Sequence, residues 1–153
     1  MNRRNILGAT LSSLAAVFAA SRAVAASDDK QPPVAPTRQK VVYHLSDLDK
    51  VGFVLGNIAN HYDGMGGPDH VTIALVVHGP ALRAFQLSQA NPDITQRFGK
   101  FVKAGLEPAA CNHTLQSQKV TLKDLQPGFV IADKGGVVKI AELQSQGYLY
   151  IRP

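Results

Sequence analysis

Short runs of apolar and β-branched residues recur along most of the chain. They lie at 40–45, 71–77, 106–111, 129–132 and 148–151. The run at 71–77 carries no charge, which is typical of a strand covered on both faces. The pattern therefore predicts five strands. In the third of them Pro108 lacks the N–H that a ladder needs, so we expect its pairing to begin after that residue.

Apolar residues at helical spacing separate several of these runs. The clearest set is Val51, Leu55, Ile58, Ala59 and Tyr62. These positions share one face of a helix, and Ser46 with Asp49 three residues later predicts a capping box at its start. Pro80 and Pro92 each stand where a helix can begin, which predicts two further helices. A last helix is expected over 136–146.

Strands and helices alternate from residue 40 to the end of the chain. Between the third and fourth strands, Thr121 and Asp124 predict only one brief capped turn. The alternation implies right-handed crossovers and a parallel sheet between layers of helices. We therefore expect an α/β fold in three layers, α/β/α, with a single domain over 40–153.

The first 39 residues follow a different pattern. Residues 1–26 combine a basic start, an apolar stretch and a small-residue site at Ala23-Val24-Ala25, as secretory signal peptides do. The adjacent Arg3-Arg4 resembles a twin-arginine export signal, and the general secretory route stays open as the alternative. Residues 27–39 are rich in proline and lack an apolar period, which predicts a flexible linker. We expect export to the periplasm.

Composition narrows the function classes. The chain has 153 residues, 45% of them hydrophobic, and a single cysteine. It is too apolar for a disordered protein and too poor in cysteine for a disulfide scaffold. The formal net charge is +5, and it falls to +2 once Arg3, Arg4 and Arg22 of the leader are left out. This charge, with no basic run between aromatic residues, argues against a nucleic-acid partner.

The residues just after each strand are the candidates for a functional site. In open parallel sheets, ligands bind at the carboxyl ends of the strands. The residues there are His44, His78-Gly79-Pro80, Cys111-Asn112-His113-Thr114 and Asp133-Lys134-Gly135-Gly136. Three histidines and the only cysteine thus converge on one edge. His61 and either Asn57 or Asn60 on the first helix could approach the same edge, which helical phase alone does not decide, and His70 belongs at the opposite edge.

Cys111 is the candidate with the most distinctive chemistry. A thiol has an ordinary pKa of about 8.5, so at neutral pH it is mostly protonated. A neighbouring imidazolium, from His78 or His113, or a helix N-terminus would raise the thiolate fraction and create a nucleophile or carrier thiol. The alternative is that Cys111 is a small buried hydrophobe, as most free cysteines are.

The histidines have structural alternatives as well. The ring of His78 could simply hold a sharp turn by bonding a nearby carbonyl, and that of His44 could face a covering helix. Imidazole and thiolate are ligands that suit zinc or copper, but the spacing of these residues matches no compact metal motif. We therefore expect no metal and no cofactor.

Five stretches of the chain together resemble the DsrE/DsrF-like family. They read KVVYHL, NIANHY, VVHGP, AACNHTL and DLQPGFVIADKGGVVKIAELQSQGYLYIRP. The resemblance covers essentially all of Lys40 to Pro153. It implies a five-stranded, mostly parallel sheet between helices and a homo-oligomer, either a trimer or a hexamer. In some members a cysteine after a central strand carries sulfane sulfur as a persulfide, and Cys111 is the matching position.

The resemblance and the residues lead to one function hypothesis and its alternative. We expect an exported sulfur carrier or sulfurtransferase-like protein that handles sulfane sulfur through a persulfide on Cys111, with a sulfur donor or acceptor protein as a partner. The expected catalytic residues are Cys111, His78 and His113, and the expected ligand-binding residues are His44, Gly79, Asn112 and Thr114. The alternative is a non-catalytic periplasmic module that binds a metal or small anion, or an oligomeric interaction protein. No membrane association is expected once the signal is cleaved.

Overall fold

The computed structural model describes residues 38–89 and 91–153. The expected signal peptide and all but the last two residues of the expected linker lie outside the described residues. The strands are β1 (Gln39–Leu45), β2 (Val71–Val77), β3 (Glu107–Cys111), β4 (Val130–Ala132) and β5 (Leu149–Ile151). The α-helices are α1 (Val51–Gly64), α2 (Pro92–Lys103), α3 (Asn112–Gln118) and α4 (Gly136–Ser145). Short 3-10 turns connect them, the longest at Gly79–Phe85.

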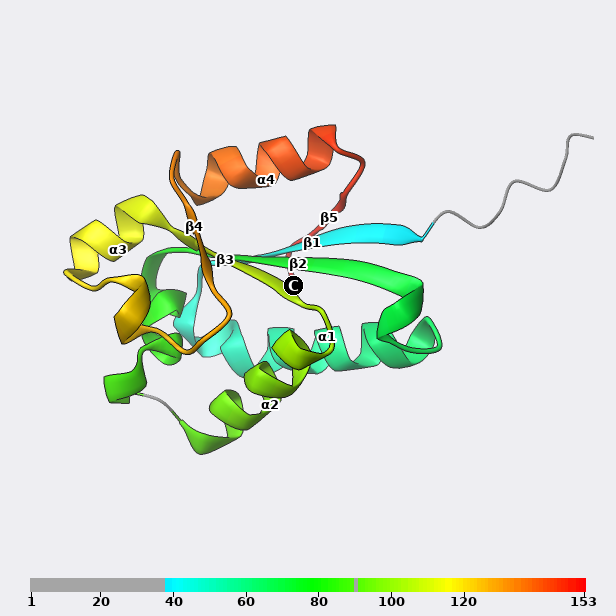
Figure 1. Cartoon of the computed structure of the whole chain (residues 1–153), viewed down its shortest axis with the longest axis horizontal. Coiled ribbons are helices and arrows are strands. Elements are labelled where there is room, and N and C mark those ends of the chain that lie inside the picture. The colour runs from blue at the N-terminus through cyan, green and yellow to red at the C-terminus, as the bar shows by residue number, and fades with distance from the viewer. Residues whose placement is uncertain (1–37, 90) are drawn as a thin grey trace, which may run out of the picture. The chain divides into compact units, whose positions relative to one another are not determined.

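The five strands form one sheet in the order β4-β3-β2-β1-β5, and every pairing is parallel. The chain steps in one direction from β1 to β4, and β5 then returns to the far side of β1. Because parallel crossovers are right-handed, this reversal places α4 on the face opposite α1 and α2 (Figure 1). The predicted α/β class and the sheet between layers of helices are confirmed.

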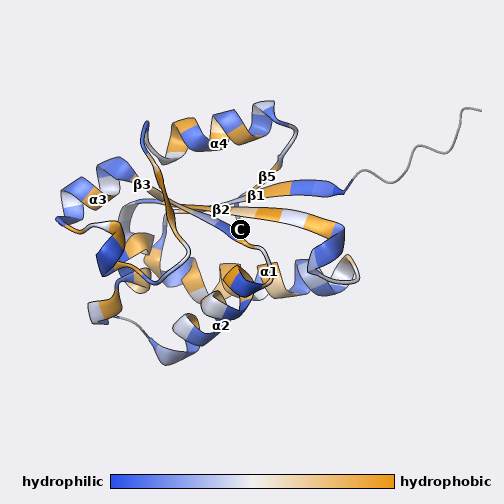
Figure 2. Ribbon diagram, in the orientation of Figure 1, coloured by the Kyte–Doolittle hydropathy of each residue, from blue (hydrophilic) through white to orange (hydrophobic). Residues whose placement is uncertain are grey.

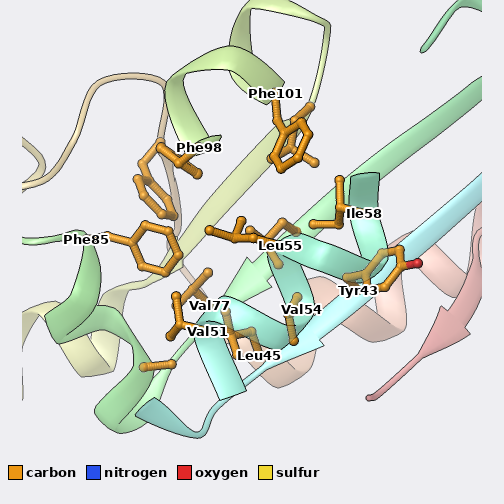
Figure 3. Close-up of a cluster of buried hydrophobic side chains, with 14 of the residues drawn as sticks. Tyr43, Leu45, Val51, Val54, Leu55, Ile58, Val77, Phe85, Phe98 and Phe101 are labelled. Carbon is orange, nitrogen blue, oxygen red and sulfur yellow. The ribbon is translucent and has the colours of Figure 1, made fainter. Parts of the chain in front are cut away.

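The two faces of the sheet carry cores of different size. The larger core fills the space between the sheet and α1 with α2, where Phe85 and Phe98 meet edge to face at 5.0 Å between ring centroids (Figure 3). The smaller core lies under α4 and comprises Val42, Ala74, Val76, Ala109, Ala132, Ile140 and Leu143. Apolar and polar residues alternate around α4, as a helix with one buried face requires (Figure 2).

Two local predictions were wrong. Ser46 and Asp49 form no capping box in the described structure, because the N-cap of the first turn falls on Asp47, and the Ser46 hydroxyl accepts a hydrogen bond from Arg152 instead. Pro108 does pair with β2, opposite Leu75. Its missing N–H costs no hydrogen bond to β4, because β4 pairs with β3 only from Ala109 onward.

Helix α3 was not predicted at all. It has seven residues, of which only Thr114 and Leu115 are buried, so it shows no apolar period long enough to detect. The helix from Pro80 is a 3-10 turn rather than an α-helix. By contrast, the predicted helix start at Asn91-Pro92 is confirmed, since the Asn91 side chain accepts from the Asp93 N–H at 2.9 Å. Among the described residues, none of the helices is long and apolar enough to cross a membrane.

Candidate functional site

Alternation along the strands gathers the predicted side chains on the α4 face of the sheet. Val42, Val76 and Ala109 belong to the small core under α4. Residues two positions further along an extended chain face the same way, and these are His44, His78 and Cys111. All three stand at the carboxyl ends of neighbouring strands, so the structure brings them together as the sequence predicts.

Cys111 lies where the N-termini of two helices meet. It is the N-cap residue of α3, and α4 begins nearby at Gly136. The side chain is buried, with 6% of its surface exposed. Burial raises the pKa of the thiol, but hydrogen bonds from backbone N–H groups of Gly136, Thr114 and His113 lower it. The Thr114 hydroxyl adds a fourth donor, and the net pKa of Cys111 lies below its ordinary value.

The hydroxyl of Thr114 has a second partner that sets its direction. The Gly79 N–H donates to Thr114 Oγ1 at 2.9 Å. With the oxygen accepting from Gly79, the hydroxyl proton is free to point at the Cys111 sulfur. Gln118 holds the same loop from the other side, because its Nε2 donates to the Gly79 carbonyl at 2.8 Å.

Two consecutive glycines allow α4 to start this close to the thiol. A Cβ atom at Gly135 would come within 2.9 Å of the His113 ring, and Gly135 has a φ of +97°. A Cβ atom at Gly136 would lie 3.3 Å from the Cβ of Cys111 and 3.4 Å from that of His78. Side chains at these positions would push the α4 amides away from the sulfur.

The thiol opens into a pocket of about 220 Å³. Its walls are His78, Cys111, His113, Lys134, Gly135, Gly136, Val137 and Val138. The pocket therefore combines two imidazoles and an ammonium group with the two exposed valines of α4. It has room for a few atoms beyond the sulfur, and the ammonium group of Lys134 favours an anionic guest.

His44 and His78 form a pair beside this pocket. Their rings stack with centroids 4.7 Å apart, and their Nε2 atoms share a hydrogen bond. The other ring nitrogen of His44, Nδ1, is hydrogen-bonded to the Tyr150 hydroxyl at 2.7 Å. Tyr150 lies on β5, His44 on β1 and His78 directly after β2, and these three strands are neighbours in the sheet.

The surroundings keep both imidazoles neutral at neutral pH. Burial, then the neighbouring His78 and Arg152, lower the pKa of His44. Burial and Arg152 likewise lower the pKa of His78, and Asp47 opposes both shifts without cancelling them. Arg152 and Asp47 form an exposed ion pair at 3.7 Å. His78 is therefore not the imidazolium that the sequence suggested as a source of positive charge beside Cys111.

The other predicted residues divide between the site and its supports. The exposed ring of His113 lies against Gly135 at the pocket wall. Asn112 turns away, because its Nδ2 donates to the Asp133 carbonyl at 3.3 Å. His61 lies on the opposite face of the sheet and is hydrogen-bonded to the Tyr43 hydroxyl at 3.0 Å. His70 is exposed beyond the amino end of β2, as predicted.

Sequence reasoning missed the roles of Tyr150 and Gly136. Tyr150 reaches His44 only because β5 pairs with β1, which the order of elements along the chain does not reveal. The Gly135-Gly136 pair between a strand and a helix was a usable signal, since such a position often brings backbone close to a ligand or side chain. Within the part of the chain that the structure describes, no group of three or more His, Cys, Asp or Glu side chains could hold a metal ion.

Comparisons with known proteins support the fold. No protein-family model matches the sequence, and no curated protein matches it. MTH1491, a protein of unknown function from Methanobacterium thermoautotrophicum, has a similar structure, with a TM-score of 0.65 and 23% identity, over 75% of this chain and 99% of that one.

Two bacterial structures are also similar. The YchN protein of E. coli gives a TM-score of 0.56 at 13% identity, over 75% of this chain and 99% of its own. BT1422, a conserved protein of unknown function from Bacteroides thetaiotaomicron, gives a TM-score of 0.55 at 12% identity, over 75% of this chain and 95% of its own. At these identities the likeness establishes the fold alone, a five-stranded parallel sheet between helices.

Proposed function

We propose that this protein is an exported DsrE/DsrF-like carrier of sulfane sulfur, which it holds as a persulfide on Cys111. The observation that carries the proposal is the set of hydrogen-bond donors around the thiol. Three backbone N–H groups and one hydroxyl lower the pKa of Cys111, although the side chain is buried. A buried cysteine that served only as a small hydrophobe would gain nothing from such a set.

Loading is a nucleophilic displacement at sulfur. The Cys111 thiolate attacks the outer, sulfane sulfur of an anionic donor such as thiosulfate. A bond forms between Cys111 Sγ and that sulfur, the S–S bond of thiosulfate breaks, and sulfite leaves with the electron pair. The product is the persulfide anion Cys–S–S⁻, and no further oxidant or reductant is needed.

The pocket suits this donor class. Lys134 lines it with a largely exposed ammonium group, which pairs with Glu142 at 3.4 Å and also attracts an anion. Val137 and Val138 give the mouth an apolar rim. This apolar rim lies next to the exposed, polarisable sulfane sulfur that the thiolate attacks.

Mass spectrometry of the intact protein tests the proposal. After incubation with thiosulfate or polysulfide, the protein should gain about 32 Da, one sulfur atom, and dithiothreitol should remove it. Cys111→Ser should gain nothing. His70→Gln, which changes an exposed histidine at the opposite edge of the sheet, should load as the wild type does. An unmodified wild-type protein, or equal loading of Cys111→Ser, would refute the proposal.

A second candidate is binding of a small anion without turnover. One observation favours it: the ammonium group of Lys134 lines the pocket beside Cys111. This candidate predicts a thermal shift when sulfate or phosphate is added, with no gain of mass on Cys111. The absence of any such shift would rule it out.

We also propose that the protein acts in the periplasm as a homo-oligomer. Export rests on the leader-like pattern of residues 1–26. Oligomerisation is supported by exposed apolar side chains on the two outer strands of the sheet, at Val130 and Ile131 of β4 and at Leu149 of β5. Outer strands with exposed apolar residues can pair with a strand of another chain.

A further inference from the structure

A row of hydrogen-bonded side chains connects solvent to the Cys111 pocket. Tyr150, 43% exposed, stands at the outer end and bonds His44. His44 bonds His78, and His78 lines the pocket that holds the thiol. Every link joins groups that can both donate and accept a proton. Loading of Cys111 by attack of a thiolate does not use this row, so its function needs another explanation.

The geometry allows only two ordered arrangements of protons along the row. Two Nε2 atoms in contact can hold one proton between them. If the Tyr150 hydroxyl donates to His44 Nδ1, then His44 Nε2–H donates to His78 Nε2, and His78 carries its proton on Nδ1. In the reverse arrangement every donor becomes an acceptor. Switching between the two transfers one proton along the row and leaves both imidazoles neutral.

We propose that Tyr150, His44 and His78 form a proton relay that protonates the outer sulfur of the Cys111 persulfide when sulfur is passed on. The inference rests on the proposed function and names a step of it. A persulfide anion is a nucleophile, and a thiolate acceptor is repelled by it. Protonation gives Cys–S–SH, whose outer sulfur accepts attack.

The transfer step balances with one proton from solvent. The acceptor thiolate R–S⁻ attacks the outer sulfur of Cys–S–SH and forms the R–S bond. The bond between the two persulfide sulfurs breaks, and Cys111 Sγ leaves with the electron pair. The products are R–S–SH and the Cys111 thiolate. The donors that lower the pKa of Cys111 also make it a good leaving group, because they stabilise the thiolate it becomes.

The surroundings of the row favour a neutral relay. Arg152 and Asp47 pair with each other at the end of β5 and β1, and Arg152 also donates to the Ser46 hydroxyl at 3.3 Å. Lys134 is the ammonium group on the pocket side. Arg152 and Lys134 are each paired with a carboxylate, Asp47 and Glu142 respectively. Burial is the main cause of the lowered pKa of both imidazoles and disfavours a stored imidazolium, so protons pass through the row and do not remain on a ring.

Single-turnover transfer separates this relay from a structural role. Wild type, Tyr150→Phe and His44→Gln are loaded with thiosulfate, their loading is measured by mass, and the sulfur is then passed to glutathione. Tyr148→Phe is the matched control, because its hydroxyl donates to Glu107 rather than to a histidine. We expect equal loading in all four proteins, and transfer about 10-fold slower in Tyr150→Phe and in His44→Gln than in the other two.

A solvent isotope effect gives a readout that packing alone would not change. Wild-type transfer should slow in D₂O, and this effect should shrink in Tyr150→Phe but not in Tyr148→Phe. If Tyr150→Phe loads normally and transfers at the wild-type rate with the same isotope effect, the relay is wrong. A wild-type protein that takes up no sulfur at all would refute the proposed function, and the relay with it.

Discussion

At the scale of single residues, the hydrogen-bond donors around Cys111 set the pKa of its thiol. Backbone N–H groups do not titrate, so their stabilisation of a thiolate persists over the whole physiological pH range. The lowered pKa of His78 makes its ring neutral there and removes it as a source of charge. Fixed backbone N–H groups at the starts of α3 and α4 thus lower the pKa of the thiol without a charge from His78.

Thr114→Val tests the contribution of the side-chain donor. Valine has nearly the same shape but no hydroxyl, so the pKa of Cys111 should rise and its thiolate fraction should fall. The rate of loading by thiosulfate at neutral pH should drop on the order of 3- to 10-fold. Loading rates of variant and wild type should converge at high pH, where both thiols are ionised. Ser117→Ala, on the same helix and bonded to the Thr114 carbonyl, is the control and should load normally.

The residues at the strand ends could be predicted from sequence, and their partners could not. Parallel strands end at one edge, so His44, His78 and Cys111 had to lie near one another. Which nitrogen faces which atom depends on sheet order and on the angle of α4. For that reason Tyr150 and the Gly136 amide, two of the closest participants, were found only in the structure.

At the scale of elements, the site is the junction of α3 and α4 with the end of β3. Each helix contributes N–H groups that have no partner inside the helix, and Cys111 accepts hydrogen bonds from both sets. Gly135 makes this possible, because its φ of +97° turns the chain sharply from β4 into α4 beside the His113 ring.

Two glycine variants separate backbone strain from crowding at this junction. Gly147→Ala places a side chain at a φ of +88° with nothing within 4 Å, so it should cost about 1–3 kcal/mol of stability through strain alone. Gly135→Ala brings a Cβ atom within 2.9 Å of the exposed His113 ring, which can rotate away, so urea unfolding should show a similar loss. A clearly larger loss would mean that the His113 ring is held in place and that crowding adds to the strain.

The elements that the sequence failed to predict are the short ones. Apolar periodicity identified β2 and α1, where burial of a long face dictates the structure. Helix α3 buries little and is fixed by its neighbours, so a local pattern does not reveal it. Ser46 and Asp49 matched a capping pattern by chance, and the chain turned one residue later, at Asp47.

At the scale of the whole molecule, the two faces of the sheet are unequally covered. One helix, α4, covers the face that carries the site, because only one crossover lies on that side. A cavity of about 370 Å³ remains between α4 and the exposed end of β3, with Leu106, Pro108 and Val130 among its walls. The face that holds Cys111 is therefore also the face with unused apolar surface.

Light scattering after size-exclusion chromatography checks the proposed oligomer. The wild type should elute as a trimer or hexamer, and Val130→Lys, which places a charge on the outer strand β4, should shift it towards monomer. Leu87→Lys is a matched control, because Leu87 is as exposed as Val130 but lies in a turn rather than on an outer strand. A wild-type protein that is monomeric at all concentrations contradicts the proposal.

Three half-buried histidines predict a loss of stability in mild acid. Burial is the main cause of the lowered pKa values of His44, His61 and His78 in the folded protein. In the unfolded chain a histidine has a pKa of about 6.5, so below that pH the unfolded state binds protons that the folded state does not. The urea midpoint of the wild type should therefore fall as the pH drops below about 6.5, and the midpoint of His61→Gln should fall less. A midpoint that stays level or rises in this range would contradict the shifts.

The alkylation rate of Cys111 across the pH range measures whether its thiolate is stabilised in the folded protein. Iodoacetamide reacts with the thiolate, so the rate follows ionisation of the only thiol in the chain. We predict a half-maximal rate below the ordinary thiol pKa of about 8.5. A midpoint at or above that value, or a thiol that stays unreactive in the folded protein at every pH, would contradict the account.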